Sequence, residues 1–366
     1  MALVGYAVMV AVPVLSTALV QKAGFTAEQV GRIWGADLGG LALGAVISAF
    51  LVAKINRWYL VWFGVLLSVA ANLLCMEYSS YQALLLLRAS AGVGSGIFTA
   101  VAVVTLGGTS KPVIAFNLEL VGFAFSTALE LHYLPQLEMN EIYLFFISLS
   151  VLCAFLVIFI PQGPSTKAEL AVQEEQADYT ENWNVPRALP LICLLAICFT
   201  YINIGGYFTY IELAALEDGV AEDWVGSVLT WSSFLGIAGC AIAFYATRFG
   251  LFKPLILSLV ALVCIVAMLS AGVNDINVFI SLFGFMTIWT FADVYQASIL
   301  AHMDRSGSLV ALIPSVQGFG QFVGPNIAAS IVGAGLGYGL MFAVSATMAA
   351  VAMALYIGIA SYIRRH

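Results

Sequence analysis

The stretch 80–106, SYQALLLLRASAGVGSGIFTAVAVVTL, holds a single charged side chain, Arg88, in an otherwise apolar run. A helix that crosses a bilayer needs about 20 mostly apolar residues. The whole chain repeats this character, because 62% of its 366 residues are hydrophobic and only 9% are charged, against about 25% charged in soluble proteins. This composition excludes a soluble enzyme, and the net charge of -7 argues against a nucleic-acid partner.

Further apolar runs on both sides of this stretch predict twelve transmembrane segments. Only helices and closed barrels satisfy every backbone polar group in lipid, and long apolar runs without strand alternation indicate helices. We therefore expect an all-α polytopic membrane protein. The predicted spans are 3–20, 29–53, 58–76, 80–106, 112–134 and 141–160 in the first half, and 188–211, 224–246, 254–272, 276–301, 308–332 and 337–362 in the second.

The basic residues predict the orientation of these spans. If the N-terminus is cytoplasmic, only Lys22 and Arg32 fall in outer loops, and Arg88 lies within a span. An excess of Lys and Arg on one side marks the cytoplasmic side. We expect both termini in the cytoplasm and, from the compact loops, a bacterial cytoplasmic (inner) membrane. The inner-side residues are Lys54, Arg57, Lys111, Lys167, Arg187, Arg248, Lys253, Arg305, Arg364 and Arg365.

The chain also divides into two related halves. Ala27-Glu28-Gln29-Val30-Gly31 opens the second span, and Ala221-Glu222-Asp223-Trp224-Val225-Gly226 opens the eighth. The stretch 162–186 between the halves is polar and acidic, as is typical of a solvated linker. We predict two pseudo-symmetric six-helix bundles, 1–161 and 187–366, joined by a cytoplasmic acidic linker at 162–186.

Two local motifs resemble those of the major facilitator superfamily. Arg88 is followed by Gly92, Gly94 and Gly96, as in the fourth helix of that family. The turn Ala49-Phe-Leu51-Val-Ala53-Lys54-Ile-Asn56-Arg57-Trp58 is similar to the family's turn between helices two and three, but Ala53 replaces its acid and Asn56 a glycine. The resemblance implies two six-helix bundles and secondary transport by alternating access, most often coupled to protons.

Charged side chains within the spans are candidates for proton coupling, because a charge at the bilayer centre is costly and usually faces a cavity or a partner. Asp293 has no Lys or Arg in its own span. Glu119 shares a helical face with Phe123, Ser126 and Glu130. Asp37 and Arg88 lie at similar depths, so they form a static ion pair or one that exchanges partners, unless Arg88 binds an anionic substrate directly. Glu130 and His132 are expected near the outer surface, in contact with solvent.

Uncharged polar and aromatic side chains are the substrate-binding candidates. Amides and phenols hydrogen-bond a solute while aromatic faces stack on it. The alternative is that they only join helices to each other. The candidates are Asn203, Tyr207, Tyr210, Trp289, Gln296, Gln317 and Gln321.

These observations favour a secondary active transporter that imports a small polar or amphipathic organic solute with protons, as a symporter. The proton gradient is its expected energy source, without cofactor or metal, and its partners are the solute and the lipid bilayer around a functional monomer. A proton-driven drug or metabolite efflux antiporter is the alternative, although the fifth span lacks the family's internal Gly-Pro. A polytopic membrane enzyme is disfavoured because His132, His302 and His366 lack metal-ligand spacing. A non-transporting receptor is the remaining hypothesis.

Overall fold

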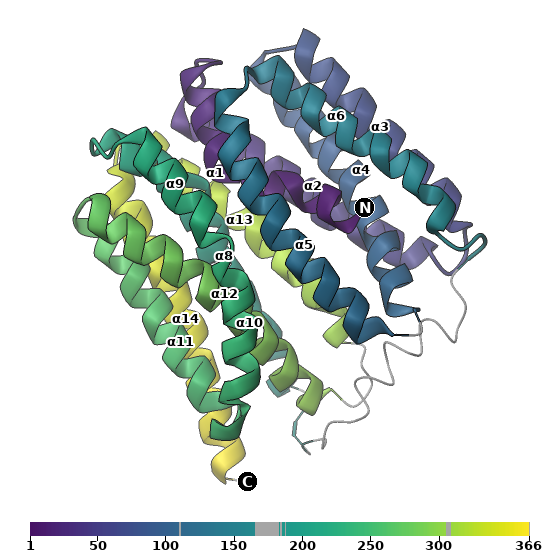
Figure 1. Cartoon of the computed structure of the whole chain (residues 1–366). Helices are drawn as coiled ribbons and strands as arrows, with labels where there is room; N and C mark the ends of the chain where they lie inside the picture. The colour runs from purple at the N-terminus through teal and green to yellow at the C-terminus, as the bar shows by residue number, and fades with distance from the viewer. Residues whose placement is uncertain (110, 165–182, 184, 187, 305–308, 366) are drawn as a thin grey trace. The chain divides into compact units, whose positions relative to one another are not determined.

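The computed structural model describes the chain except residues 110, 165–182, 184, 187, 305–308 and 366 (Figure 1). Its described part is built of α-helices and short 3-10 turns and contains no strand, which confirms the predicted fold class. The helices are α1 (Ala2–Gln21), α2 (Ala27–Leu51), α3 (Arg57–Glu77), α4 (Tyr81–Gly107), α5 (Pro112–Tyr133), α6 (Met139–Leu156), α8 (Ala188–Glu217), α9 (Glu222–Ser232), α10 (Leu235–Ala246), α11 (Phe252–Ala267), α12 (Asp275–Met303), α13 (Ile313–Gly333) and α14 (Gly337–Arg365).

Eleven helical segments of the described chain are long and apolar enough to cross a membrane. Helices α9 and α10 count together as one such segment, Glu222–Phe249. The expected span 308–332 corresponds to α13, which is not among the eleven. Its sequence includes Gln317, Gln321 and Asn326, and these amides lower its hydropathy.

The chain forms two compact units, Met1–Gln176 and Ala177–His366. Helices α1 to α6 belong to the first, called unit 1 here, and α8 to α14 to the second, unit 2. The predicted linker, 162–186, falls largely outside the described residues, so the boundaries at 161 and 187 remain predictions.

Local sequence explains where several helices begin. The Thr26 hydroxyl accepts a hydrogen bond from the backbone N–H of Gln29 at 3.2 Å. The Gln29 side-chain oxygen accepts one from the backbone N–H of Thr26 at 3.1 Å. Asn274 and Asn277 form the same reciprocal arrangement at the start of α12. Each pair satisfies backbone N–H groups that have no partner within the helix.

Glycines set the distance between α2 and α4 in unit 1. A Cβ added to Gly92 would overlap the backbone carbonyl of Asp37, and one added to Gly96 would overlap that of Leu41. Small residues let helix backbones approach closely, and this contact is a main source of attraction between helices in lipid. The glycines that follow Arg88 therefore hold α4 against the helix that carries Asp37.

This packing makes unit 1 sensitive to one added methyl group. We expect Gly92→Ala to destabilise the protein by about 1–3 kcal/mol, because the helices must separate to accept the Cβ. Gly358→Ala is the matched control, since a Cβ there meets nothing within 4 Å. Thermal unfolding of the purified protein in detergent measures both, and equal stability of the two variants would contradict the packing argument.

Candidate functional site

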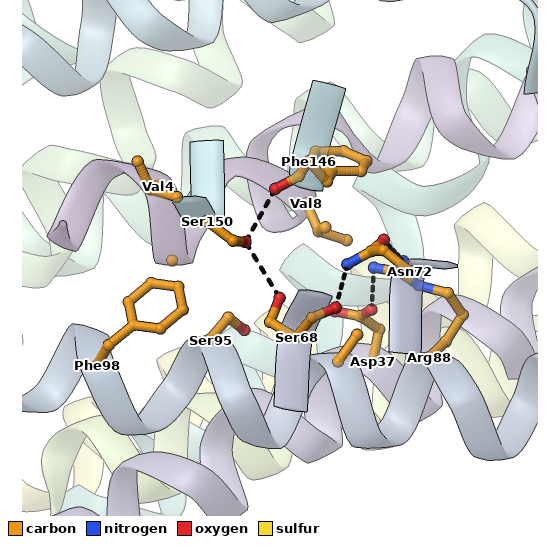
Figure 2. A pocket seen from close by; sticks show the side chains of 12 residues that line it. Val4, Val8, Asp37, Ser68, Asn72, Arg88, Ser95, Phe98, Phe146 and Ser150 are labelled. Atoms are coloured by element: carbon orange, nitrogen blue, oxygen red, sulfur yellow. Dashed lines mark hydrogen bonds and ion pairs between the residues drawn. The ribbon is translucent and has the colours of Figure 1, made fainter. Parts of the chain in front are cut away.

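A small polar cavity lies inside unit 1, lined by residues of α1, α2, α3, α4 and α6 (Figure 2). Its volume of about 20 Å³ suits one water molecule. An organic solute does not fit, so the cavity is no binding site for the transported molecule. Its polar lining residues are Asp37, Ser68, Asn72, Arg88, Ser95 and Ser150.

Arg88 and Asp37 form an ion pair beside this cavity. Arg88 Nη2 lies 2.5 Å from Asp37 Oδ2, and each residue is 1% exposed. Arg88 Nη1 also donates to Asn72 Oδ1 at 2.7 Å, and Asn72 Nδ2 donates to the Ser68 carbonyl at 2.8 Å (Figure 2). Since α2, α3 and α4 each supply a member, the charge of Asp37 is compensated within a closed cluster.

Aromatic rings complete the surroundings of the Arg88 guanidinium. Its Cζ lies 5.4 Å from the centroid of the Trp34 ring and 5.9 Å from that of Phe146. Rings at these distances attract a cation. Asn72 and the two rings were not predicted from the sequence; a lone amide in the apolar span 58–76 was the available signal for Asn72. Whether the pair takes part in coupling remains a prediction.

Glu119 and Glu130 lie on α5 in different environments. Glu119 is half-buried, and it lies within electrostatic reach of Tyr6 on α1. Glu130 is only 5% exposed, so the expectation that solvent surrounds it is wrong. It shares the buried face of Thr127 and Leu131, whereas His132 is exposed. The expectation was wrong because Glu130 lies near a helix end, and the sequence does not show which face of that helix a neighbouring helix covers.

Asp293, on α12 in unit 2, accepts its hydrogen bonds from a neutral side chain. The Tyr201 hydroxyl of α8 lies 2.8 Å from each carboxylate oxygen. Trp289 Nε1 in turn donates to the Tyr201 oxygen at 3.2 Å. Among the described residues, no Lys, Arg or His lies within ion-pair distance of Asp293. Tyr201 was not predicted from the sequence.

Aromatic side chains continue from this carboxylate along α8 and α12. The ring of Trp289 lies 6.4 Å from that of Tyr201 and 6.0 Å from that of Phe208, both in edge-on geometry. Phe285 lies 5.6 Å from Trp289 and stacks on Phe208 at 5.6 Å. Asp293 and Trp289, both predicted, therefore belong to one cluster of an acid and aromatic rings.

The other predicted binding residues take part in helix packing within unit 2. Asn203 Nδ2 donates to the Ser345 carbonyl at 2.8 Å, and the Tyr207 hydroxyl lies 3.1 Å from Ser281 Oγ. Gln296 Nε2 donates to Thr200 Oγ1 at 2.8 Å. Their contacts match the helix-joining alternative, and their role in binding remains a prediction. Tyr210 and Gln321 are also buried, whereas Gln317 is half-buried.

Metal-ligating side chains do not gather in the part of the chain that the structure describes. No group of three or more His, Cys, Asp or Glu residues there is close enough to hold an ion.

The closed cluster in unit 1 predicts an asymmetric response to mutation. Arg88→Met leaves Asp37 buried without its counter-charge, and we expect a loss of about 3–5 kcal/mol in unfolding free energy. The double variant Asp37→Leu with Arg88→Met removes both charges, and we expect it to be more stable than the single variant. Thermal unfolding tests this, with Arg32→Met, at the partly exposed pair with Glu28, as control. A double variant less stable than Arg88→Met would contradict it.

Comparisons with known proteins agree with this architecture. No curated protein matches the sequence. Among solved structures, a point mutant of the nucleoside transporter NupG is similar with a TM-score of 0.73 at 10% identity, covering 98% of this chain and 97% of that chain. Unmutated NupG gives 0.72 at 12% identity, covering 98% and 96%. The human organic anion transporter MFSD10 gives 0.64 at 12% identity, covering 97% and 98%.

The family model of the Major Facilitator Superfamily matches residues 1–325, which include most of both units. The chain belongs to the Major Facilitator Superfamily and is a secondary transporter rather than an enzyme.

Proposed function

We propose that the protein moves a small polar or amphipathic organic solute together with protons, and that Asp293 is the carboxyl group that binds and releases the proton. The observation that carries the proposal is that Asp293 lies in a transmembrane helix with the Tyr201 phenol as its hydrogen-bond donor and no described basic residue within ion-pair distance.

Asp37 and Asp293 have different partners, and this difference supports the assignment. Asp37 has a counter-charge in Arg88, so protonating it would leave a buried guanidinium without its anion. Asp293 leaves no buried cation behind when it takes up a proton. In the charged state it keeps the Tyr201 hydroxyl as donor, and hydrogen bonds to the charged form stabilise that form. Both states of Asp293 are therefore accessible within one fold.

Glu119 is the second candidate for proton binding. It is half-buried on α5, in the same unit as the Asp37 and Arg88 pair. Tyr6, on the first helix of unit 1, lies within its electrostatic reach, as Tyr201, on the first helix of unit 2, bonds to Asp293. We assign it a secondary role because it is only half-buried.

The aromatic cluster beside Asp293 supports a solute with a flat, apolar part and hydrogen-bonding groups. Trp289 is half-exposed and offers its indole face, while Asp293 accepts from, or when protonated donates to, a polar group. Because two of the similar solved structures are of a nucleoside transporter, nucleosides are a rational first set of probes.

Uptake is the direction that we propose. The family's drug antiporters carry an internal Gly-Pro in the fifth helix, whereas α5 contains only Pro112, at its first turn. The Gly324-Pro325 pair is in α13 instead. A bacterial cytoplasmic membrane, cytoplasmic termini and a monomeric state complete the proposal.

Replacing the proposed proton site tests the coupling. A thermal-shift screen of solutes on the purified protein first identifies a ligand, since binding to the folded state raises stability. In proteoliposomes with an inward proton gradient, we expect Asp293→Asn to abolish uphill uptake of that ligand while solute exchange continues. Asp275→Asn, at the exposed start of the same helix, is the matched control and should accumulate solute normally. Uphill, pH-dependent uptake by Asp293→Asn would remove Asp293 from the mechanism, and outward flux driven by the same gradient would replace uptake by export.

A further inference from the structure

The helical segment Glu222–Phe249 is interrupted near its middle by a turn at Ser233 and Phe234, between α9 and α10, and this turn is called the bend. Three backbone bonds there reach back three residues instead of four: Phe234 to Trp231 at 3.4 Å, Gly236 to Ser233 at 3.4 Å and Ile237 to Phe234 at 3.2 Å. Tightened turns of this kind within a helix often mark a hinge.

Two serine hydroxyls build this bend. Ser232 Oγ and Ser233 Oγ both donate to the carbonyl of Leu229, at 2.9 and 3.1 Å. In a regular helix this carbonyl accepts the backbone amide of Ser233. Serine side chains that bond to the preceding turn compete with the backbone and bend helices. The bend is therefore encoded by the Ser232-Ser233 pair.

Helix α12 fixes both sides of the bend. On the α10 side, Thr290 Oγ1 donates to the carbonyl of Gly236 at 2.9 Å, and Gly239 packs directly against Thr287 and Thr290. On the α9 side, Trp224 Nε1 donates to the carbonyl of Asp275 at 3.2 Å. The bond from Thr290 lies nearer the bend and holds the first turn of α10.

Thr290 is also a close neighbour of Asp293, three residues further along α12 and hence on the adjoining part of the same face. Cys240 of α10 lies within hydrogen-bonding reach of Thr290 and within electrostatic reach of Asp293. The titratable groups that face Asp293 from packed helices are Tyr201 of α8, Cys240 of α10 and Tyr356 of α14. They are two phenols and a thiol, whose ordinary pKa values are about 8.5 to 10, so Asp293 is the one carboxyl group in this set.

We propose that Thr290 is a positioning residue that transmits the charge of Asp293 to the bend between α9 and α10. A hydroxyl group has one proton to donate. When Asp293 is neutral, the Thr290 proton bonds to the Gly236 carbonyl and fixes the bend. When Asp293 is charged, its carboxylate competes for that proton, because hydrogen bonds to charged acceptors are the stronger ones. The Gly236 carbonyl is then released, and α9 pivots on α10.

Helix α2 of unit 1, whose opening sequence resembles that of α9, has no such bend. Helix α2 runs unbroken over Ala27–Leu51, and the charge of its Asp37 is paired with Arg88. A charge-dependent bend is thus expected in unit 2, where no described Lys, Arg or His pairs with the acid. This inference rests on the proposed function only in that Asp293 changes its charge during transport.

Distance measurements across the bend test the inference. Spin labels on Glu222→Cys and Phe244→Cys, both at exposed positions, report the angle between α9 and α10 in a background where the exposed Cys264 is replaced by Ser. We expect the distance distribution to change between acidic and alkaline pH. Thr290→Val, which keeps the shape but removes the hydroxyl, should lose most of that change, and Thr290→Ser should retain it.

Thr287→Val is the matched control, because the Thr287 hydroxyl donates within its own helix, to the Phe283 carbonyl at 3.0 Å. It should behave as the parent does. If Thr290→Val does not fold, Thr290→Ala takes its place. A pH-dependent distance change that survives loss of the Thr290 hydroxyl, or a parent protein without such a change, overturns this inference alone. Uphill uptake by Asp293→Asn instead overturns the proposed function, so the two failures are distinguishable.

Discussion

The lipid interior offers no hydrogen bonds, so every polar group placed there must find its partner within the protein. Helices satisfy the backbone by themselves, and the remaining question is how each buried side chain is compensated. Arg88 is the most demanding case, because a charged guanidinium at membrane depth is costly. Asp37 compensates its charge, and Asn72 accepts a second hydrogen bond from it. The glycines of α4 bring α2 near enough for the ion pair to form. The architecture of unit 1 follows from that requirement.

Unit 2 meets the same requirement by other means. Its membrane acid, Asp293, is held by a tyrosine that an indole supports in turn, so that its carboxylate has a hydrogen-bond donor but no opposing charge among the residues that the structure describes. Such a carboxyl is free to exchange a proton without leaving a buried cation unpaired. The helix beside it is bent by Ser232 and Ser233 rather than continuous. The two units therefore differ in how they hold a membrane acid: unit 1 pairs it with a cation, and unit 2 holds it with a phenol.

The sequence predicted the helices well because apolar length and the cost of an unsatisfied backbone leave few alternatives. It also singled out Arg88, Asp37 and Asp293, since charges are rare in these spans. It could not supply Tyr201 or Asn72, which become partners only through contacts between distant helices. It placed Glu130 in solvent because helical periodicity gives a face and not the neighbour that covers it. The sequence predicted a continuous span at 224–246. The bend within it depends on the hydrogen bonds that the Ser232 and Ser233 hydroxyls donate to the Leu229 carbonyl, which the sequence does not show.

The central claim is that one carboxyl of the membrane interior changes its protonation while another stays fixed. Difference infrared spectroscopy between acidic and alkaline samples observes this directly, through the carbonyl band of a protonated carboxylic acid. The account predicts a pH-dependent band that disappears in Asp293→Asn and persists in Asp37→Asn. A band that persists without Asp293 and is lost without Asp37 would contradict it.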